Sequence, residues 1–147
     1  MKWKMISAAA LFGGVALCSA FAAEGTHDSR IAIMKKVGGA AGALAGIAKG
    51  EKPYDAEVVK ASLSTIAEMA KAFPAQFGAG SDMKDPEVNP KLWTNMDDFK
   101  AKAAKLQTDA ETAMAAPPAD PAAVGALLKS LGADCGACHQ AYRIKKD

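Results

Sequence analysis

The sequence predicts an all-α protein, an antiparallel four-helix bundle with up-down-up-down order, and three observations carry this prediction. Four segments place apolar residues at alternating spacings of three and four, as amphipathic helices do. No segment alternates apolar and polar residues as a half-buried strand would. The joints between the segments are mostly short, which favours antiparallel neighbours packed around one core.

The first 22 residues have the composition of a secretory signal, and we expect them to be removed. Two lysines open the chain, an apolar run covers residues 6–17, and residues 20–22, Ala-Phe-Ala, form a small-residue cleavage site. The apolar run is too short to span a bilayer. Removal of residues 1–22 takes Cys18 with it and leaves residues 23–147 as one compact domain with no stable membrane insertion.

The first two predicted helices run from about Asp28 to Lys49 and from a cap at Asp55 to about Phe73, where Pro74 stops the second. Their apolar stripes are Met34, Val37, Ala41, Leu44 and Ala48, and then Val59, Leu63, Ile66, Ala70 and Phe73. Four glycines cost the first helix roughly 1 kcal/mol each against alanine. Either something must come close to that backbone, or the helix is weak or kinked there.

Residues 74–89 have the composition of an ordinary surface loop. Asn89 and Pro90 form a cap and first-turn pair that predicts the start of the third helix, which residues 117–118, Pro-Pro, end. Asp120 repeats that cap before the fourth helix. The stripes are Leu92, Met96, Phe99, Ala103, Leu106, Ala110 and Ala113, and then Val124, Leu127 or Leu128, Leu131, Cys135, Cys138 and Tyr142.

The fourth predicted helix contains Cys135-Gly136-Ala137-Cys138-His139, the spacing of a c-type haem attachment site. On a helix the two cysteines share one face and can form thioethers to neighbouring porphyrin edges, while the histidine points the same way and can bind the iron. Three alternatives are weaker. A thioredoxin-like dithiol belongs near a βαβ pattern, a structural zinc site usually needs four ligands, and the plainest alternative is two ordinary helix cysteines beside a surface histidine.

The bundle order predicts what lies on the other face of a haem. The end of the fourth helix should lie beside the start of the first, so the residues expected at the haem end are Met34, Met69, Met83, Trp93 and Met96, with Met114 at the far end. Met34 faces inward on the neighbouring helix and is the best-placed sixth ligand, although a methionine on an apolar stripe is usually core filler. His27 precedes the first helix, and we expect it to be mobile and not to contact the iron.

Composition excludes several classes of function. The chain has 18 basic and 16 acidic residues, and removal of the two signal lysines leaves the mature side chains balanced. There is no basic surplus of the kind that binds nucleic acid or anionic membranes. No paired carboxylates or activated nucleophile accompany the cysteine motif, so we do not expect an enzyme.

The C-terminal segment resembles the class II c-type cytochromes, the cytochrome c′ family. The residues that carry this resemblance run from Cys135 to Arg143 and include Tyr142. Further similarities are Arg30-x-x-x-Met34-Lys35 followed by Gly38-Gly39, the joint from Gly46 to Asp55, and Trp93-x-x-Met96-Asp97-Asp98-Phe99. The resemblance covers essentially the whole mature chain. It implies one haem c held covalently by Cys135 and Cys138, His139 as the proximal ligand, and residue 34 facing the distal side of the iron.

The family has two branches, and this resemblance favours the low-spin one, in which a methionine at the position of Met34 ligates iron. In the high-spin branch the iron is five-coordinate, and the segment from Trp93 to Phe99 is equally similar to those members. By the same resemblance Arg143 matches a basic position beside the proximal face; its alternative is a helix-end cation. Arg30 could pair with a haem propionate or be solvated, and Trp93 is a third candidate haem contact. A homodimer through the first helix is consistent with the family.

Three functions are therefore expected in order. The first is a periplasmic one-electron carrier that exchanges electrons with redox partner proteins, with His139 and Met34 as axial ligands. The second is a five-coordinate protein that binds nitric oxide or carbon monoxide, with Met34 only a steric gate. The third, outside haem chemistry, is a structural bundle that carries a dithiol.

Overall fold

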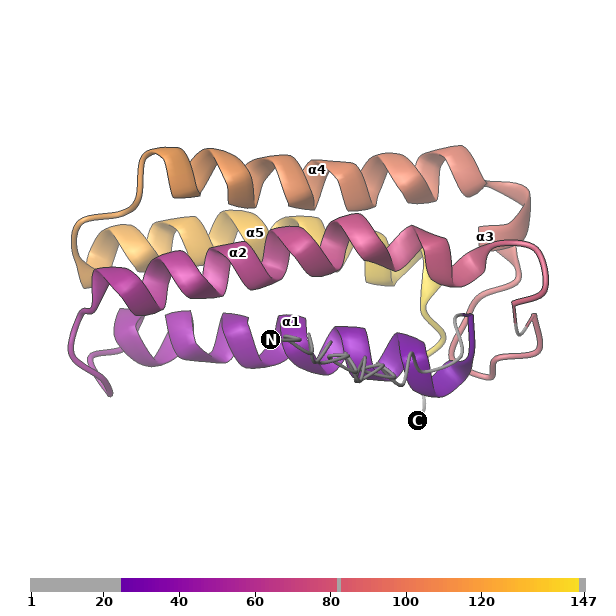
Figure 1. The fold of residues 1–147 in the computed structure, drawn as a ribbon, viewed down its shortest axis with the longest axis horizontal. Helices are drawn as coiled ribbons and strands as arrows, with labels where there is room; N and C mark the ends of the chain where they lie inside the picture. Colours follow the sequence, from indigo (N-terminus) through magenta and orange to yellow (C-terminus); the bar gives the residue numbers. More distant parts are fainter. Residues whose placement is uncertain (1–24, 82, 146–147) are drawn as a thin grey trace, which may run out of the picture.

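The computed structural model describes residues 25–81 and 83–145, and it confirms the four-helix bundle (Figure 1). The predicted signal, residues 1–22, lies outside the described residues. The long helices are α1 (His27–Ala48), α2 (Ala56–Ala72), α4 (Met96–Ala115) and α5 (Pro121–Tyr142); a 3₁₀ turn, η1 (Phe73–Phe77), and a short helix, α3 (Lys91–Thr94), lie between α2 and α4. Contacts join α1 to α2, α2 to α4, α4 to α5 and α5 to α1, so the first and last helices are neighbours.

Side-chain caps fix where three of the long helices begin. The Asp55 carboxylate accepts hydrogen bonds from the first backbone amides of α2, and Asp120 accepts one from the Ala123 amide at 2.8 Å, so both predicted caps are confirmed. A capping box that the sequence analysis did not identify starts α1, where Thr26 and Ser29 each bond the other's backbone amide. After α1, Gly50 has a φ of +72°, which lets the chain reverse without strain.

The predicted third helix begins about where expected, but it is not continuous. The N-cap of α3 is Pro90 rather than Asn89, whose side chain accepts a hydrogen bond from the Lys91 amide at 3.0 Å, and α3 ends after four residues. Asn95 has φ −129° and ψ 41°, outside the helical region, and its side-chain amide donates to the Lys91 carbonyl. The long helix α4 therefore begins at Met96, and Trp93 lies on a separate short element.

The core has two parts. The main one fills the bundle with aliphatic residues of all four long helices, among them Leu44, Leu63, Ala110 and Leu131. A second, more aromatic cluster of Phe77, Leu92, Phe99 and Tyr142 lies at the end of the bundle where α1 begins and α5 ends. Its presence shows that residues 74–89 are not the ordinary surface loop predicted, because Gln76, Phe77 and Asp85 are buried.

Helix α1 is long and rich in apolar residues. By length and composition it is the one helix among the described residues that could cross a membrane, and 22% of its most apolar stretch is buried in the bundle. Val37, Leu44 and Ile47 point into the core, as expected for the core helix of a bundle. Gly39 and Gly42 face outward, with no atom within 4 Å of the place a Cβ would occupy.

Candidate functional site

A cavity of about 350 Å³ lies between the first turns of α1 and the last turns of α5. On the α5 side it is lined by Cys135, Cys138, His139 and Tyr142; on the α1 side by Ile31, Met34, Val37, Gly38 and Ala41. Phe73, Phe77, Leu92 and Phe99 contribute aromatic and aliphatic surface. The cavity is thus mostly apolar and has the size of a small-molecule or cofactor site.

The α5 wall presents two thiols and an imidazole. Cys135 and Cys138 are half-buried and unbridged, three residues apart on the face of α5 that lines the cavity. Burial raises the pKa of both thiols, and the nearby Asp134 carboxylate raises that of Cys135 further. A redox dithiol requires the opposite, a depressed pKa that favours the thiolate, so the thioredoxin-like alternative gains no support.

His139 lies at the cavity mouth, and the pKa of its ring is lowered from the ordinary value, first by burial and then by the Arg143 guanidinium. A lowered pKa favours the neutral imidazole, which is the form that binds a metal. The end of α5 is fixed immediately afterwards, since the Arg143 amide donates to the His139 carbonyl at 3.0 Å. Within residues 25–81 and 83–145, no three His, Cys, Asp or Glu side chains are grouped as a protein-only metal site would need.

The facing wall carries a thioether and a glycine. Met34 borders the cavity, and it is the only methionine among the described residues that does. Met69, Met96 and Met114 pack against the two core clusters instead, and Met83 is 64% exposed. Beside Met34, Gly38 has no atom within 4 Å of the place its Cβ would occupy, so the cavity reaches the helix backbone there. This fits the expectation that something approaches the glycine backbone of the first helix.

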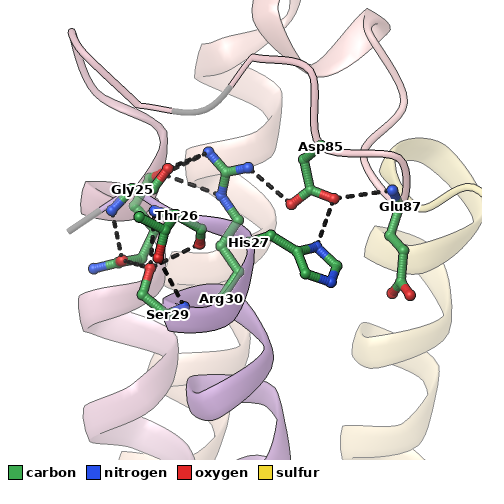
Figure 2. A network of polar contacts seen from close by, with 8 residues as sticks. Gly25, Thr26, His27, Ser29, Arg30, Asp85 and Glu87 are labelled. Carbon is green, nitrogen blue, oxygen red and sulfur yellow. Dashed lines mark hydrogen bonds and ion pairs between the residues drawn. The ribbon is translucent and has the colours of Figure 1, made fainter. Parts of the chain in front are cut away.

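The cavity rim holds a buried polar network that the sequence analysis missed (Figure 2). Arg30 is 4% exposed; its Nη1 donates to Asp85 Oδ2 at 2.9 Å, and its guanidinium stacks 4.2 Å from the centre of the Phe77 ring. Of the two alternatives expected for Arg30, the solvated one is therefore wrong. The expectation that His27 is mobile is also wrong, because His27 opens α1 and its Nδ1 lies 2.9 Å from Asp85 Oδ1.

Asp85 is the centre of this network. Burial alone would raise the pKa of its carboxyl, but hydrogen bonds from the Glu87 amide, Arg30 and His27 outweigh burial and hold the pKa below its ordinary value. Arg30 also donates to the carbonyls of Gln76 and Gly25, and the Gln76 side chain accepts from the Gly25 amide. The start of α1 is thereby joined to η1 and to residue 85.

The other two candidate haem contacts differ in their positions. Arg143 lines the cavity, and its Nη2 lies 3.6 Å from Glu87 Oε2. Trp93 does not line the cavity: its ring packs 5.8 Å from that of Phe77, and its Nε1 has no hydrogen-bond partner among the described residues. Trp93 lies on the separate short helix α3 and packs against the aromatic cluster, which includes Tyr142 of α5, outside the cavity.

The residues around the cavity fit a haem. A porphyrin needs an apolar slot, two thiols on one wall can tether it, a neutral imidazole on the same helix can bind its iron, and a thioether stands on the facing wall. Four helices around such a site define a c-type cytochrome of the four-helix-bundle class.

Comparison with known proteins supports this class of protein. Residues 26–143 match the family model described as cytochrome C′. The chain is 75% identical over 123 residues to "Cytochrome c-556" from Agrobacterium tumefaciens (strain apple 185). The matched region covers 84% of this chain and 98% of that protein. Solved structures from Rhodopseudomonas palustris are similar too: cytochrome c′, with TM-score 0.72 and 34% identity, and oxidized cytochrome c556, with TM-score 0.71 and 31% identity. Each of these two matches covers 82% of this chain and 96% of the chain in the solved structure.

The chain belongs to the cytochrome c′ family. Its cofactor is accordingly covalently bound haem c, and it is an electron-transport haem protein. The resemblance on which the sequence analysis relied is confirmed.

Proposed function

We propose that this protein is a one-electron carrier whose haem is tethered by Cys135 and Cys138 and ligated by His139 on one face and Met34 on the other. One observation carries the proposal: the only methionine among the described residues that lines the cavity lies on the wall facing the Cys-x-x-Cys-His segment. The haem supplies the redox centre. The chain supplies two neutral ligands, and methionine opposite histidine favours a low-spin iron with a raised reduction potential.

The surroundings support transfer of an electron rather than catalysis. The two carboxylates that line the cavity, Asp85 and Glu87, are each paired with an arginine, Arg30 and Arg143, which does not favour a role as general acid or base. His139 at the cavity mouth is exposed, so a haem bound there would have an edge within reach of a redox partner protein. We propose no enzymatic turnover.

The test is the spectrum of the purified holoprotein and of Met34→Ala. We expect a low-spin ferric spectrum with a sulfur-to-iron charge-transfer band in the wild type, and a high-spin spectrum with prompt carbon monoxide binding in Met34→Ala. Met69→Ala is the matched control, because Met69 packs against the main core away from the cavity. If Met34→Ala keeps the wild-type spectrum, Met34 is not a ligand.

A five-coordinate protein that binds nitric oxide or carbon monoxide is the second candidate. The observation in its favour is the largely apolar α1 wall, where Met34 could gate the distal side without binding iron. Its mark is a high-spin ferrous spectrum in the unmodified protein. The same absorption measurement therefore separates the two candidates.

We further propose that residues 1–22 are a cleaved signal and that the mature protein works in the periplasm. The basic start, apolar run and small-residue site support this. N-terminal sequencing of protein from the periplasmic fraction should begin at residue 23 or 24.

A homodimer through α1 is supported by the outward-facing Gly39 and Gly42, and sedimentation of the wild type against Gly39→Glu tests it.

A further inference from the structure

The rim segment, residues 85–89, is hydrogen-bonded to both walls of the cavity. On one side it meets the first turn of α1 (Figure 2), and on the other it meets the last residue of α5 and the two residues that follow. Three residues of this segment, Asp85, Glu87 and Val88, themselves line the cavity. A connection of this kind sets how far apart the two walls stand.

Asp85 makes the connection to α1. Its side chain is 2% exposed, and its two oxygens are divided between partners: Oδ2 accepts from Arg30, while Oδ1 faces His27 and accepts from the Glu87 amide. A buried carboxylate with charged and backbone partners holds a fixed geometry, because moving it would leave a buried charge unpaired. The carboxylate thus ties the start of α1 to the rim segment.

Backbone hydrogen bonds make the connection to α5. The Asn89 amide donates to the Tyr142 carbonyl at 2.9 Å, and the Ile144 amide donates to the Glu87 carbonyl at 2.9 Å. Val88 and Arg143 form an antiparallel β-bridge between these two bonds. The end of α5 is thus held to the rim segment as two short strands are held in a sheet.

The two proposed iron ligands stand one helical turn inside these attachments. Met34 is four residues after Arg30 on α1, and His139 is four residues before Arg143 on α5. We infer that Asp85 is a positioning residue: through the rim segment it fixes the separation of α1 and α5 at the cavity, and so the approach of residue 34 to the iron. This inference rests on the proposed function for the site, and it concerns a residue that lines the cavity but is not one of the proposed iron ligands.

Two variants break the connection at different ends. Asp85→Asn keeps the shape and one acceptor oxygen but places an amide donor against Arg30. Ile144→Pro removes the donor of the Ile144–Glu87 bond; Ile144 is 41% exposed, and Arg143 before it has φ −103° and ψ 133°, which a following proline accepts. Ile144→Ala keeps the amide and is the matched control.

The measurement is carbon monoxide binding by the reduced holoprotein, together with amide hydrogen exchange at Asn89. We expect Asp85→Asn and Ile144→Pro to bind carbon monoxide at least tenfold faster than the wild type, about 1.4 kcal/mol in the barrier, and to exchange the Asn89 amide faster. Ile144→Ala should match the wild type in both. Should Asp85→Asn fail to fold, the comparison of Ile144→Pro with Ile144→Ala alone decides whether the rim segment controls carbon monoxide binding.

The outcomes separate this inference from the proposed function. A high-spin wild type would overturn ligation by Met34, yet the ratio of carbon monoxide rates would still report whether the rim segment sets the width of the distal side. A wild-type carbon monoxide rate in Asp85→Asn would overturn the role of Asp85, and a wild-type rate in Ile144→Pro would overturn the role of the rim segment as a whole, whatever the spin state of the wild type.

Discussion

Replacing Phe99 by alanine tests whether the aromatic cluster supports the haem end of the bundle. Phe99 is 1% exposed, and its ring centre lies 4.9 Å from that of Phe77, 5.5 Å from that of Tyr142 and 6.0 Å from that of Phe73. A buried Phe→Ala change costs about 3–5 kcal/mol. Each aromatic contact adds roughly 0.5–1.5 kcal/mol beyond burial, so we expect a loss of about 4 kcal/mol or more.

The assay is urea unfolding of the holoprotein followed by circular dichroism, with thermal unfolding as a second measure. At about 3 °C per kcal/mol for a chain of this size, the midpoint should fall by about 12 °C. Val58→Ala is the control; Val58 is 38% exposed, and surface changes usually stay within about 0.5 kcal/mol. A loss below about 1 kcal/mol for Phe99→Ala would refute the view that this cluster holds the end of the bundle together.

Two other predictions concern the same end of the bundle. The hydrogen bond from the Tyr142 hydroxyl to Asp98 raises the pKa of Tyr142 to about 12 from the model-compound value of 10.0, so its contribution to stability is complete below pH 10 and is lost as the pH rises through 12. Unfolding of Tyr142→Phe should lack that part of the alkaline loss, and identical pH profiles for the two proteins would contradict the assignment. Gly25 has a φ of +82°, and a Cβ there would lie 2.7 Å from the Ser81 Cβ, so Gly25→Ala should cost about 1–3 kcal/mol in urea unfolding. An unchanged midpoint would show that the chain can relax around the new methyl group.

Local signals predicted the helices well, and the errors arose where contacts join distant residues. Asp55 and Asp120 were recognisable as caps because their partners lie two or three residues away. The partnership of Arg30 with Asp85 spans 55 residues and leaves no trace in the spacing of either segment. Without that partner, Arg30 could only be assigned to a propionate or to solvent.

The early end of α3 has a local cause, the hydrogen bond from the Asn95 side-chain amide to the Lys91 carbonyl. The apolar stripe continues through Leu92, Met96 and Phe99 as if one helix held all three, and the interruption at Asn95 has no apolar signal. The apolar stripe does predict correctly which side chains are buried, since Leu92 and Phe99 are both 1% exposed. The cysteine motif and Met34 were predicted to lie together from bundle order alone, and the structure brings them to one cavity.

The two walls of the cavity belong to the first and last helices of the chain. Met34 and His139 are about 105 positions apart in the sequence, so their meeting at one cavity depends on the packing of α1 on α2, α2 on α4 and α4 on α5. Each of these contacts shortens the loop that remains to be closed between α1 and α5, and the entropic cost of closure grows only slowly with loop length. A macrocycle fixed to α5 would bury its own apolar surface between α5 and α1, so covalent attachment of the cofactor should stabilise the closed bundle against unfolding.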